Sequence, residues 1–468
     1  MTYSQAIAFL DSLVNYEKLA GPRNEFKLDN IRRLLELAGN PQRKMRNVIL
    51  VAGTKGKGSV CYMLEAALRG CKLSTGMFIS PHVLDVRERI QFDGKPIPKS
   101  LFAALVARLA PFVSSVRPSS LVPRPDAVAV SYFEMTTAMA FLLFAERQPD
   151  YSVVEVGLGG RLDATNLSEP IVSVIARIGY DHLKVLGDTL TEIAGEKAGI
   201  MREGRPVVIG EQESEALAAL KRKAHKAGAY LVQAGSVVSV PFVQPVADGL
   251  RFDTRCWLGS GAIRLPLLGR HQAENCKTAL AVLSGLSIRD PRVSFKRVAR
   301  GIGTVSIPAR CQVVRQRPLT IVDSCHNPES GRALANVLRD HLPVLRSANR
   351  RSPSAARHSP KIVLVYGSLS GKLVAETVVP LAPYVEQAVL VQPDNPRAMP
   401  LAELESVFTD LSIPYVTADS VPAALSVART SYFVLRPSSF PIVIAGSFYL
   451  AGEVLKVLGP SRARSRFL

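Results

Sequence analysis

The residues that could do chemistry begin with a glycine-punctuated segment, Gly53-Thr54-Lys55-Gly56-Lys57-Gly58-Ser59. The apolar or small residues 48–52 before it predict a buried strand, and residues 61–68 after it are good helix formers. A strand, a glycine turn and a helix start together favour polyphosphate binding, because backbone N–H groups and the helix dipole both attract the anion. Lys57 would neutralise phosphate oxygens, and Ser59 could offer its hydroxyl to Mg²⁺.

This segment does not meet the strict P-loop pattern, because Gly58 stands between Lys57 and Ser59. Taken alone, it could also be a tight strand-to-helix turn that carries a surface lysine. The choice therefore depends on the rest of the chain.

Polar residues also close two other predicted strands. Glu155 lies at the end of strand-like residues 152–156, and Asp181-His182 follows strand-like residues 171–178. In parallel α/β sheets, ligands bind at the carboxyl ends of strands. A buried carboxylate needs a cation, and its hard oxygen atoms suit Mg²⁺. A salt-bridged strand end for Glu155 and a structural role for His182 remain the alternatives.

The elements that must position these residues alternate between strand and helix. In the first part of the chain, further strands are predicted at 72–79, 207–210, 250–258 and 262–267, and helices at 4–19, 28–37, 101–110, 133–146, 214–226 and 272–283. Beyond a glycine-containing stretch at 301–305, which we interpret as a hinge, strands are predicted at 319–323, 361–366, 387–391 and 441–445, and helices at 328–339, 373–379, 401–408 and 421–428. This alternation predicts an α/β fold with mostly parallel sheets. The serine-, proline- and arginine-rich residues 346–360 are expected to form a surface insertion.

Composition narrows the class of protein. The 468 residues predict about two to four domains, and 47% hydrophobic residues can form real cores. No apolar run approaches the ~20 residues of a membrane span, and the N-terminal residues do not resemble a signal peptide. The six scattered cysteines contain no C-x-x-C pair, which argues against a disulfide framework or a zinc site and favours the reducing cytoplasm.

The net charge of +19 suits an anionic partner. Lysine and arginine are spread along the chain, and no nucleic-acid motif accompanies them. We therefore expect anionic small substrates rather than nucleic acid.

Several stretches together resemble one family, the folylpolyglutamate synthases and dihydrofolate synthases of the Mur-type ATP-dependent ligases. The matching stretches are residues 51–59, 75–82, 87–90, 131–136, 155–166, 181–187, 194–199, 271–275 and 323–328. The resemblance implies an N-terminal P-loop ATP-binding domain with a mostly parallel sheet, residues 1–303, and a C-terminal Rossmann-like α/β domain, residues 304–468. It places the active site between the two domains and implies that they close on ATP.

The resemblance also implies the reaction. An ATP-dependent acid–amino-acid ligase would add L-glutamate to a folate or dihydropteroate carboxylate through an acyl phosphate, forming ADP and phosphate. A muramyl-type amino-acid ligase is the nearest alternative, and a nucleic-acid-stimulated P-loop ATPase is the alternative of another class. We expect a monomer without a membrane partner.

Site roles follow from the resemblance residue by residue. ATP contacts are expected at Gly53 to Ser59, Asn275, Arg310, Asp323 and His326, and two Mg²⁺ ions at Ser59, Ser80, Glu155 and His182. Lys197 matches a lysine that the family carries as a carbamate formed with CO₂, and the family pattern leaves room for a monovalent cation. The catalytic set would be Lys57, Glu155, His182, Lys197 and Arg310.

The pterin or pteroate contacts of the family match Leu28, Asp29, Tyr132, Phe133, Leu162, Asp163 and Ala164. Phe133 could stack on a flat ring, although an ordinary core position is the alternative. Asp163 would hydrogen-bond the polar edge of the pterin.

Two departures from the family pattern fall in the C-terminal part. The usual D-G-A-H-N-P is Asp323-Ser324-Cys325-His326-Asn327-Pro328 here, and the usual P-G-R is Pro308-Ala309-Arg310. Both departures keep the charged residues, so we expect a local difference in loop shape.

Overall fold

The structure is a computed structural model that describes residues 1–16, 27–116, 130–348, 361–434 and 440–459. The last residues of the helix predicted at 4–19, residues 17–19, and most of the predicted insertion, residues 349–360, therefore lie outside the described residues. The chain divides into two compact units. The first contains Met1–Pro241, Asp253–Ile263 and Glu274–Val305, and the second contains Phe242–Phe252, Arg264–Ala273 and Ser306–Leu468.

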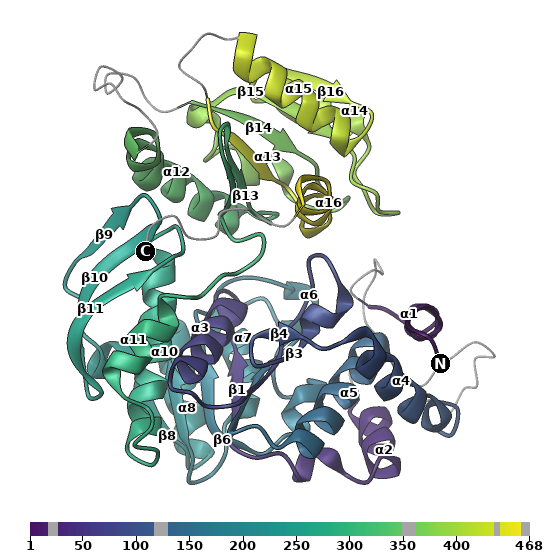
Figure 1. Cartoon of the computed structure of the whole chain (residues 1–468), viewed down its shortest axis with the longest axis vertical. Coiled ribbons are helices and arrows are strands. Elements are labelled where there is room, and N and C mark those ends of the chain that lie inside the picture. The colour runs from purple at the N-terminus through teal and green to yellow at the C-terminus, as the bar shows by residue number, and fades with distance from the viewer. Residues whose placement is uncertain (17–26, 117–129, 349–360, 435–439, 460–468) are drawn as a thin grey trace. The chain divides into compact units, whose positions relative to one another are not determined.

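The first unit is built on an eight-stranded sheet in the order β4-β3-β2-β5-β1-β6-β7-β8 (Figure 1). Its strands are β1 (Val48–Ala52), β2 (Thr75–Phe78), β3 (Ile90–Phe92), β4 (Lys95–Pro96), β5 (Tyr151–Glu155), β6 (Pro170–Ile175), β7 (Pro206–Ile209) and β8 (Tyr230–Gln233). Pairing is parallel from β2 to β8, and β3 and β4 add antiparallel strands at one edge. Every residue of β1 is buried, as expected for a parallel strand covered on both faces.

Helices cover both faces of this sheet. One face shares a core with α1 (Tyr3–Asp11), α2 (Asp29–Leu37), α4 (Lys99–Val113), α5 (Tyr132–Arg147), α7 (Leu190–Lys197) and α8 (Ser214–Lys226). Outside that core, α3 (Lys57–Gly70) packs against β1, β2 and β5, and α11 (Phe295–Ile302) packs along α3. The remaining helices are α6 (Leu183–Leu186), α9 (Ala234–Val237) and α10 (His271–Ser287). A small separate sheet has the order β11-β10-β9, with β9 (Val243–Val246), β10 (Gly249–Cys256) and β11 (Gly259–Leu265).

The second unit contains a six-stranded sheet in the order β12-β13-β17-β14-β15-β16. Its strands are β12 (Gln312–Gln316), β13 (Leu319–Val322), β14 (Ile362–Tyr366), β15 (Val385–Val391), β16 (Tyr415–Ala418) and β17 (Ile442–Ala445). Only the edge strand β12 is antiparallel. The helices α12 (Pro328–Ala348), α13 (Val374–Val378) and α14 (Leu401–Asp410) share one core, while α15 (Val421–Val434) and α16 (Phe448–Leu458) pack on the sheet outside it. This helix–sheet–helix arrangement is the predicted Rossmann-like architecture.

The α/β prediction is confirmed, and two details need correction. The helix predicted at 4–19 ends at Asp11, where the backbone turns at Ser12. Gly301, predicted as part of a flexible hinge, lies in α11 instead. A Cβ at this position would lie 2.2 Å from the carbonyl oxygen of Ala66, so Gly301 allows the close approach of α11 to α3.

Candidate active site

The glycine segment turns sharply between β1 and α3. Gly53 has φ +146° and Gly56 has φ +85°, in the region that favours glycine. A Cβ at Gly53 would lie 2.9 Å from the Cβ of Ala176, and one at Gly56 would lie 2.2 Å from Oδ1 of Asn275. The structure therefore brings the predicted ATP contact Asn275 against the segment, and both glycines are sterically required.

The backbone N–H groups of the segment divide into two sets. Those of Thr54 and Lys55 donate to the carbonyl oxygen of Arg177, at 2.9 and 3.1 Å. The first helical bond of α3 runs from Val60 N to Gly56 O, and α3 begins at Lys57. Since the first N–H groups of a helix lack helical acceptors, the N–H groups of residues 57–59 are of the kind that can bind an anion. Thr54 and Lys55 instead hold the turn in place, and their side chains bond to Gly179 O (3.1 Å) and Asp181 (3.2 Å).

Glu155 lies beside this helix start. It is the last residue of β5, it is 4% exposed, and its Oε2 accepts the N–H of Ser80 at 3.1 Å. A Cβ at Gly58 would lie 3.6 Å from the same oxygen. Glu155, Ser80 and the start of α3, where Ser59 is also buried, thus meet at the carboxyl edge of the sheet. This set of a carboxylate and two hydroxyl side chains fits the hard oxygen ligands that Mg²⁺ takes.

His182 occupies a different environment. Its side chain is 55% exposed, its N–H donates to Asp181 Oδ1, and its Nε2 lies 3.8 Å from that oxygen. Among the residues that the structure describes, no group of three or more His, Cys, Asp and Glu side chains could hold a metal ion. The structure therefore places His182 with Asp181 and Lys55, and Glu155 with Ser80 and Gly58.

Lys197 is buried directly behind the glycine turn. It ends α7, it is 3% exposed, and its Nζ donates to the carbonyl oxygen of Gly53 at 3.0 Å. Burial first, and then the positive charge of Lys57, lower the pKa of Lys197 to about 7. A large share of this amine is therefore neutral near neutral pH.

Two of the predicted pterin contacts, Tyr132 and Phe133, begin α5, and Phe133 reaches the segment that follows β5. Phe133, at the start of α5, packs beneath Gly157, where a Cβ would lie 2.5 Å from the ring, and its centroid is 5.9 Å from that of Phe78. Tyr132 is buried, with the Arg89 guanidinium 5.3 Å from its ring centroid. Phe133 is half-buried against the core, so it combines a packing role with a partly open ring.

Asp163 is the N-cap of the short helical turn Ala164–Leu167. Its Oδ1 accepts the N–H of Thr165 at 3.0 Å, and its Oδ2 accepts the N–H of Leu158 at 2.8 Å. Burial raises the pKa of this carboxyl group. Asp163 thus fixes the loop that follows β5, while Leu162 is half-buried beside it. Leu28 and Asp29 begin α2, which packs against α5.

The predicted site residues of the second unit form a separate cluster. Asp323 follows β13, and its carboxylate accepts the N–H groups of Cys311 and Cys325, both at 2.8 Å, and the Cys311 thiol at 3.2 Å. Arg310 Nη1 donates to Ser324 Oγ at 2.9 Å, and His326 Nδ1 lies 2.8 Å from Ser324 O. These bonds join the loop before β12, which carries Arg310, to the segment 323–326, which carries Asp323 and His326.

Comparison with known proteins gives one consistent result. The sequence model of the Mur ligase middle domain matches residues 93–283. The chain is 31% identical over 461 residues to the folylpolyglutamate synthase of Lacticaseibacillus casei, covering 98% of this chain and 99% of that protein. The chain belongs to the folylpolyglutamate synthase and dihydrofolate synthase family. Its members are ATP-dependent ligases, and this chain is one of them.

The solved structures of this family agree over the whole chain. The Mycobacterium tuberculosis folylpolyglutamate synthase complexed with ADP has a TM-score of 0.84 and 31% identity, with 98% of both chains covered. The FPGS–AMPPCP–folate complex has a TM-score of 0.77 and 28% identity, covering 98% of this chain. A probable bifunctional folylpolyglutamate synthase/dihydropteroate synthase of Haloferax volcanii is 32% identical, but this chain spans 50% of its length. Among the residues of this chain that the structure describes, no helix is long and apolar enough to cross a membrane.

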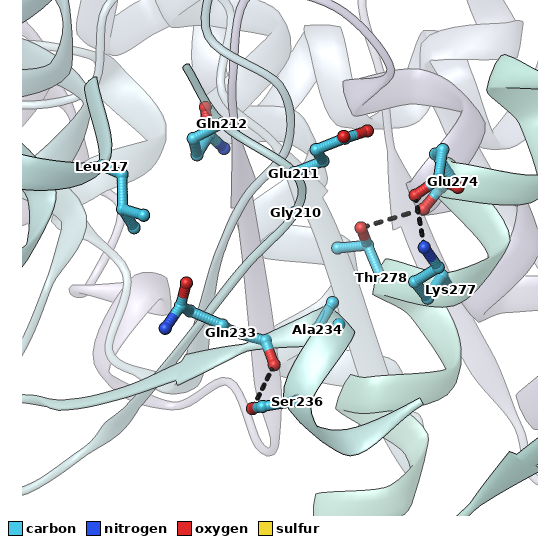
Figure 2. A pocket seen from close by; sticks show the side chains of 11 residues that line it. Gly210, Glu211, Gln212, Leu217, Gln233, Ala234, Ser236, Glu274, Lys277 and Thr278 are labelled. Atoms are coloured by element: carbon cyan, nitrogen blue, oxygen red, sulfur yellow. Dashed lines mark hydrogen bonds and ion pairs between the residues drawn. The ribbon is translucent and has the colours of Figure 1, made fainter. Parts of the chain in front are cut away.

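The first unit also contains a pocket of about 320 Å³, which no sequence motif indicated. Figure 2 shows the side chains that line it. It is lined by Gly210, Glu211, Gln212, Leu217, Gln233, Ala234, Gly235, Ser236, Glu274, Lys277 and Thr278. Lys277 and Glu274 form an ion pair at 2.7 Å, and the Thr278 hydroxyl donates to the Glu274 carbonyl oxygen at 3.1 Å. The pocket therefore borders the end of α10 that carries Asn275.

Sequence reasoning also missed three residues that organise the site. The Arg177 carbonyl oxygen holds the glycine segment, Cys311 binds Asp323, and Phe448 packs on Arg310. Arg177 acts through its backbone carbonyl, which leaves no residue-type signal, and Cys311 donates to Asp323 through both its N–H and its thiol. Phe448 lies far from Arg310 in the sequence, so only the fold joins the two.

Proposed function

We propose that this family member joins the amino group of L-glutamate to the carboxylate of a folate or a dihydropteroate. The acceptor carboxylate attacks the γ-phosphorus of ATP and forms an acyl phosphate while ADP leaves. The glutamate amine then attacks the acyl carbon, phosphate leaves, and the amine loses a proton. Activation is required because a carboxylate is a poor electrophile.

The observation that carries this proposal is the position of Glu155. Its buried carboxylate lies against Ser80 and Gly58, beside the donors at the start of α3. In this reading, the N–H groups of residues 57–59 and the Lys57 ammonium bind the phosphates, so catalysis rests on positioning and electrostatics. Gly53 to Gly56 shape the turn, and Asn275 contacts the adenine side of ATP.

Mg²⁺ would be held by Glu155, Ser59 and Ser80, with His182 at a second ion. When bound, Mg²⁺ neutralises charge on the transferring phosphoryl group. Arg310 would add a planar, bidentate contact to that group, Asp323 would meet the ribose, and His326 would complete the nucleotide contacts. Asp323 keeps one acceptor position for a ribose hydroxyl, because three bonds already occupy its two oxygen atoms.

Lys197 is proposed to react with CO₂ and carry a carbamate. The reaction needs a neutral amine, and its lowered pKa of about 7 supplies one. Carbamylation would convert this buried amine, whose pKa the charge of Lys57 lowers, into an anion able to support Mg²⁺. The family pattern also leaves room for a monovalent cation.

For the acceptor, we propose that the pterin lies near Phe133, Asp163 and Ala164, with Leu28, Asp29, Tyr132 and Leu162 around it. The exposed part of the Phe133 ring offers a stacking surface. A folate ligand in the similar FPGS–AMPPCP–folate complex supports this class of acceptor.

We also propose an ATP-binding domain at residues 1–303 and a ligase domain at residues 304–468, acting as a cytoplasmic monomer. The six cysteines are buried and free of disulfides, which supports a reducing compartment.

Incorporation of labelled L-glutamate tests the function. Dihydropteroate and tetrahydrofolate would be offered in turn, with and without ATP. We expect ATP-dependent label in the product of at least one acceptor. Label in a muramyl nucleotide sugar instead, or nucleic-acid-stimulated ATP hydrolysis without glutamate incorporation, would overturn the proposal.

A further inference from the structure

Phe448 is the first residue of α16, and its position is set by the helix cap. Ser447 is 3% exposed, and its Oγ accepts the N–H of Leu450 at 3.0 Å. The buried residues of α16 are Leu450, Ala451, Gly452, Val454 and Leu455. Phe448 itself is only half-buried, whereas these five residues are buried.

The Phe448 ring contacts two of the proposed nucleotide-binding residues. The Arg310 guanidinium carbon lies 5.0 Å from the ring centroid, within the range of a cation–π interaction. The His326 and Phe448 rings are 5.5 Å apart and inclined at 48°. One aromatic side chain therefore fixes a surface against which both Arg310 and His326 rest.

Arg310 has a second contact from a different element. Its Nη1 donates to the hydroxyl oxygen of Ser324, which is completely buried, at 2.9 Å. A free arginine samples many rotamers and loses that freedom when it binds. Contacts at one guanidinium edge and against the ring restrict those rotamers before any ligand arrives, and such preorganisation favours a reaction that depends on position.

We propose that Ser324 and Phe448 are positioning residues that hold the Arg310 guanidinium ready for the transferring phosphoryl group. This inference rests on the role of Arg310 in the proposed function. Neither residue touches the reacting atoms in this account, and both act through Arg310. All three belong to the second unit, so the arrangement is a property of that unit alone.

The test compares Phe448→Leu, Phe448→Tyr and Ser324→Ala in the full chain, by steady-state kinetics with ATP, glutamate and the pterin acceptor. Losing the ring or the hydroxyl should each lower kcat roughly threefold to tenfold. Phe448→Tyr keeps the aromatic face and should stay within about twofold of the original kcat. The KM for the pterin acceptor should not change, because that site lies in the first unit. Phe242→Leu, at a 66% exposed position of the second unit, is the matched control and should leave kcat unchanged.

The same changes in an Arg310→Ala background separate positioning from a general structural role. Without Arg310, Phe448→Leu and Ser324→Ala should cause no further loss of kcat. If Phe448→Leu and Ser324→Ala lower kcat equally in the original chain and in Arg310→Ala, the positioning role is overturned. It is also overturned if Arg310→Ala lowers kcat while Phe448→Leu and Ser324→Ala both keep the full kcat. Unchanged kcat in Arg310→Ala would instead contradict the proposed role of Arg310 itself. Thermal unfolding of each variant excludes loss of the fold as the cause.

Discussion

The glycine segment of the first unit and residues 323–326 of the second are held in place by different kinds of contact. In the first, most contacts use backbone atoms of the segment: the Arg177 carbonyl oxygen accepts two of its N–H groups, Lys197 donates to the Gly53 carbonyl oxygen, and the absence of a Cβ at Gly53 and Gly56 leaves room for Ala176 and Asn275. In the second, side chains make the contacts: the Asp323 carboxylate joins two loops, and Ser324 and Phe448 hold Arg310. Contacts made by backbone atoms in a tight turn leave little room for a larger residue. Contacts made by side chains can each be changed by a single substitution.

Replacing Glu155 should have the largest effect on turnover. Glu155→Gln keeps the shape but removes the buried negative charge beside the α3 start, and kcat should fall roughly 100- to 1,000-fold. His182→Ala should also abolish most turnover if it serves a second ion. Glu146→Gln, which breaks a surface ion pair with Arg108, is the control and should keep its activity. Near-normal rates for Glu155→Gln at saturating Mg²⁺ would remove Glu155 from the metal site.

Gly56→Ala tests whether the turn of the glycine segment requires glycine at this position. The new Cβ would collide with the amide group of Asn275 and stand at φ +85°, so the Asn275 side chain or the turn must shift. Strain of about 1–2 kcal/mol corresponds to a roughly fivefold to thirtyfold weaker affinity for ATP, measured by calorimetry with a non-hydrolysable analogue. Gly235→Ala, where a Cβ meets nothing within 4 Å, is the control. Unchanged affinity in Gly56→Ala would show that the segment is more adaptable than its contacts indicate.

Lys197 should make activity depend on bicarbonate and pH. Since only the neutral amine reacts with CO₂ and its pKa is about 7, carbamate formation should decline as pH falls below 7. Removing bicarbonate should therefore lower kcat severalfold, and the loss should be greater at pH 6 than at pH 8. Lys197→Met should have low activity that no longer responds to bicarbonate. Equal activity with and without bicarbonate at both pH values would contradict carbamylation.

His341 should make the stability of the second unit depend on pH in the acid range. It should have little effect on activity at neutral pH. Its Nε2 accepts the N–H of Gly269 at 3.0 Å, and burial lowers its pKa to about 4. The unfolded residue titrates near 6.5. Between these values the unfolded state binds more protons, so the free energy of unfolding should fall by about 3 kcal/mol as pH drops from 6.5 to 4. Denaturant unfolding across this range would measure it. A His341→Leu variant should lack this step, and an unchanged step would assign it to other groups.

The same contrast explains what the sequence could predict. The strand, the glycine spacing and Glu155 at a strand end are local patterns, and the structure places them together as expected. Other features depend on the fold: Gly301 as a helix-packing residue, the Arg177 carbonyl contact, and Phe448 against Arg310. In each of these, the partners are distant in sequence or act through backbone atoms, and so no residue pattern records them.

The most direct test of the central claim, that ATP activates the acceptor carboxylate, follows its oxygen atoms. The acceptor would be prepared with ¹⁸O in that carboxylate and incubated with the enzyme, ATP and glutamate, and the released phosphate analysed by mass spectrometry. An acyl phosphate transfers one carboxylate oxygen to phosphate when the amine attacks, so each phosphate should gain one ¹⁸O atom. Amide product accompanied by phosphate without ¹⁸O would contradict the account.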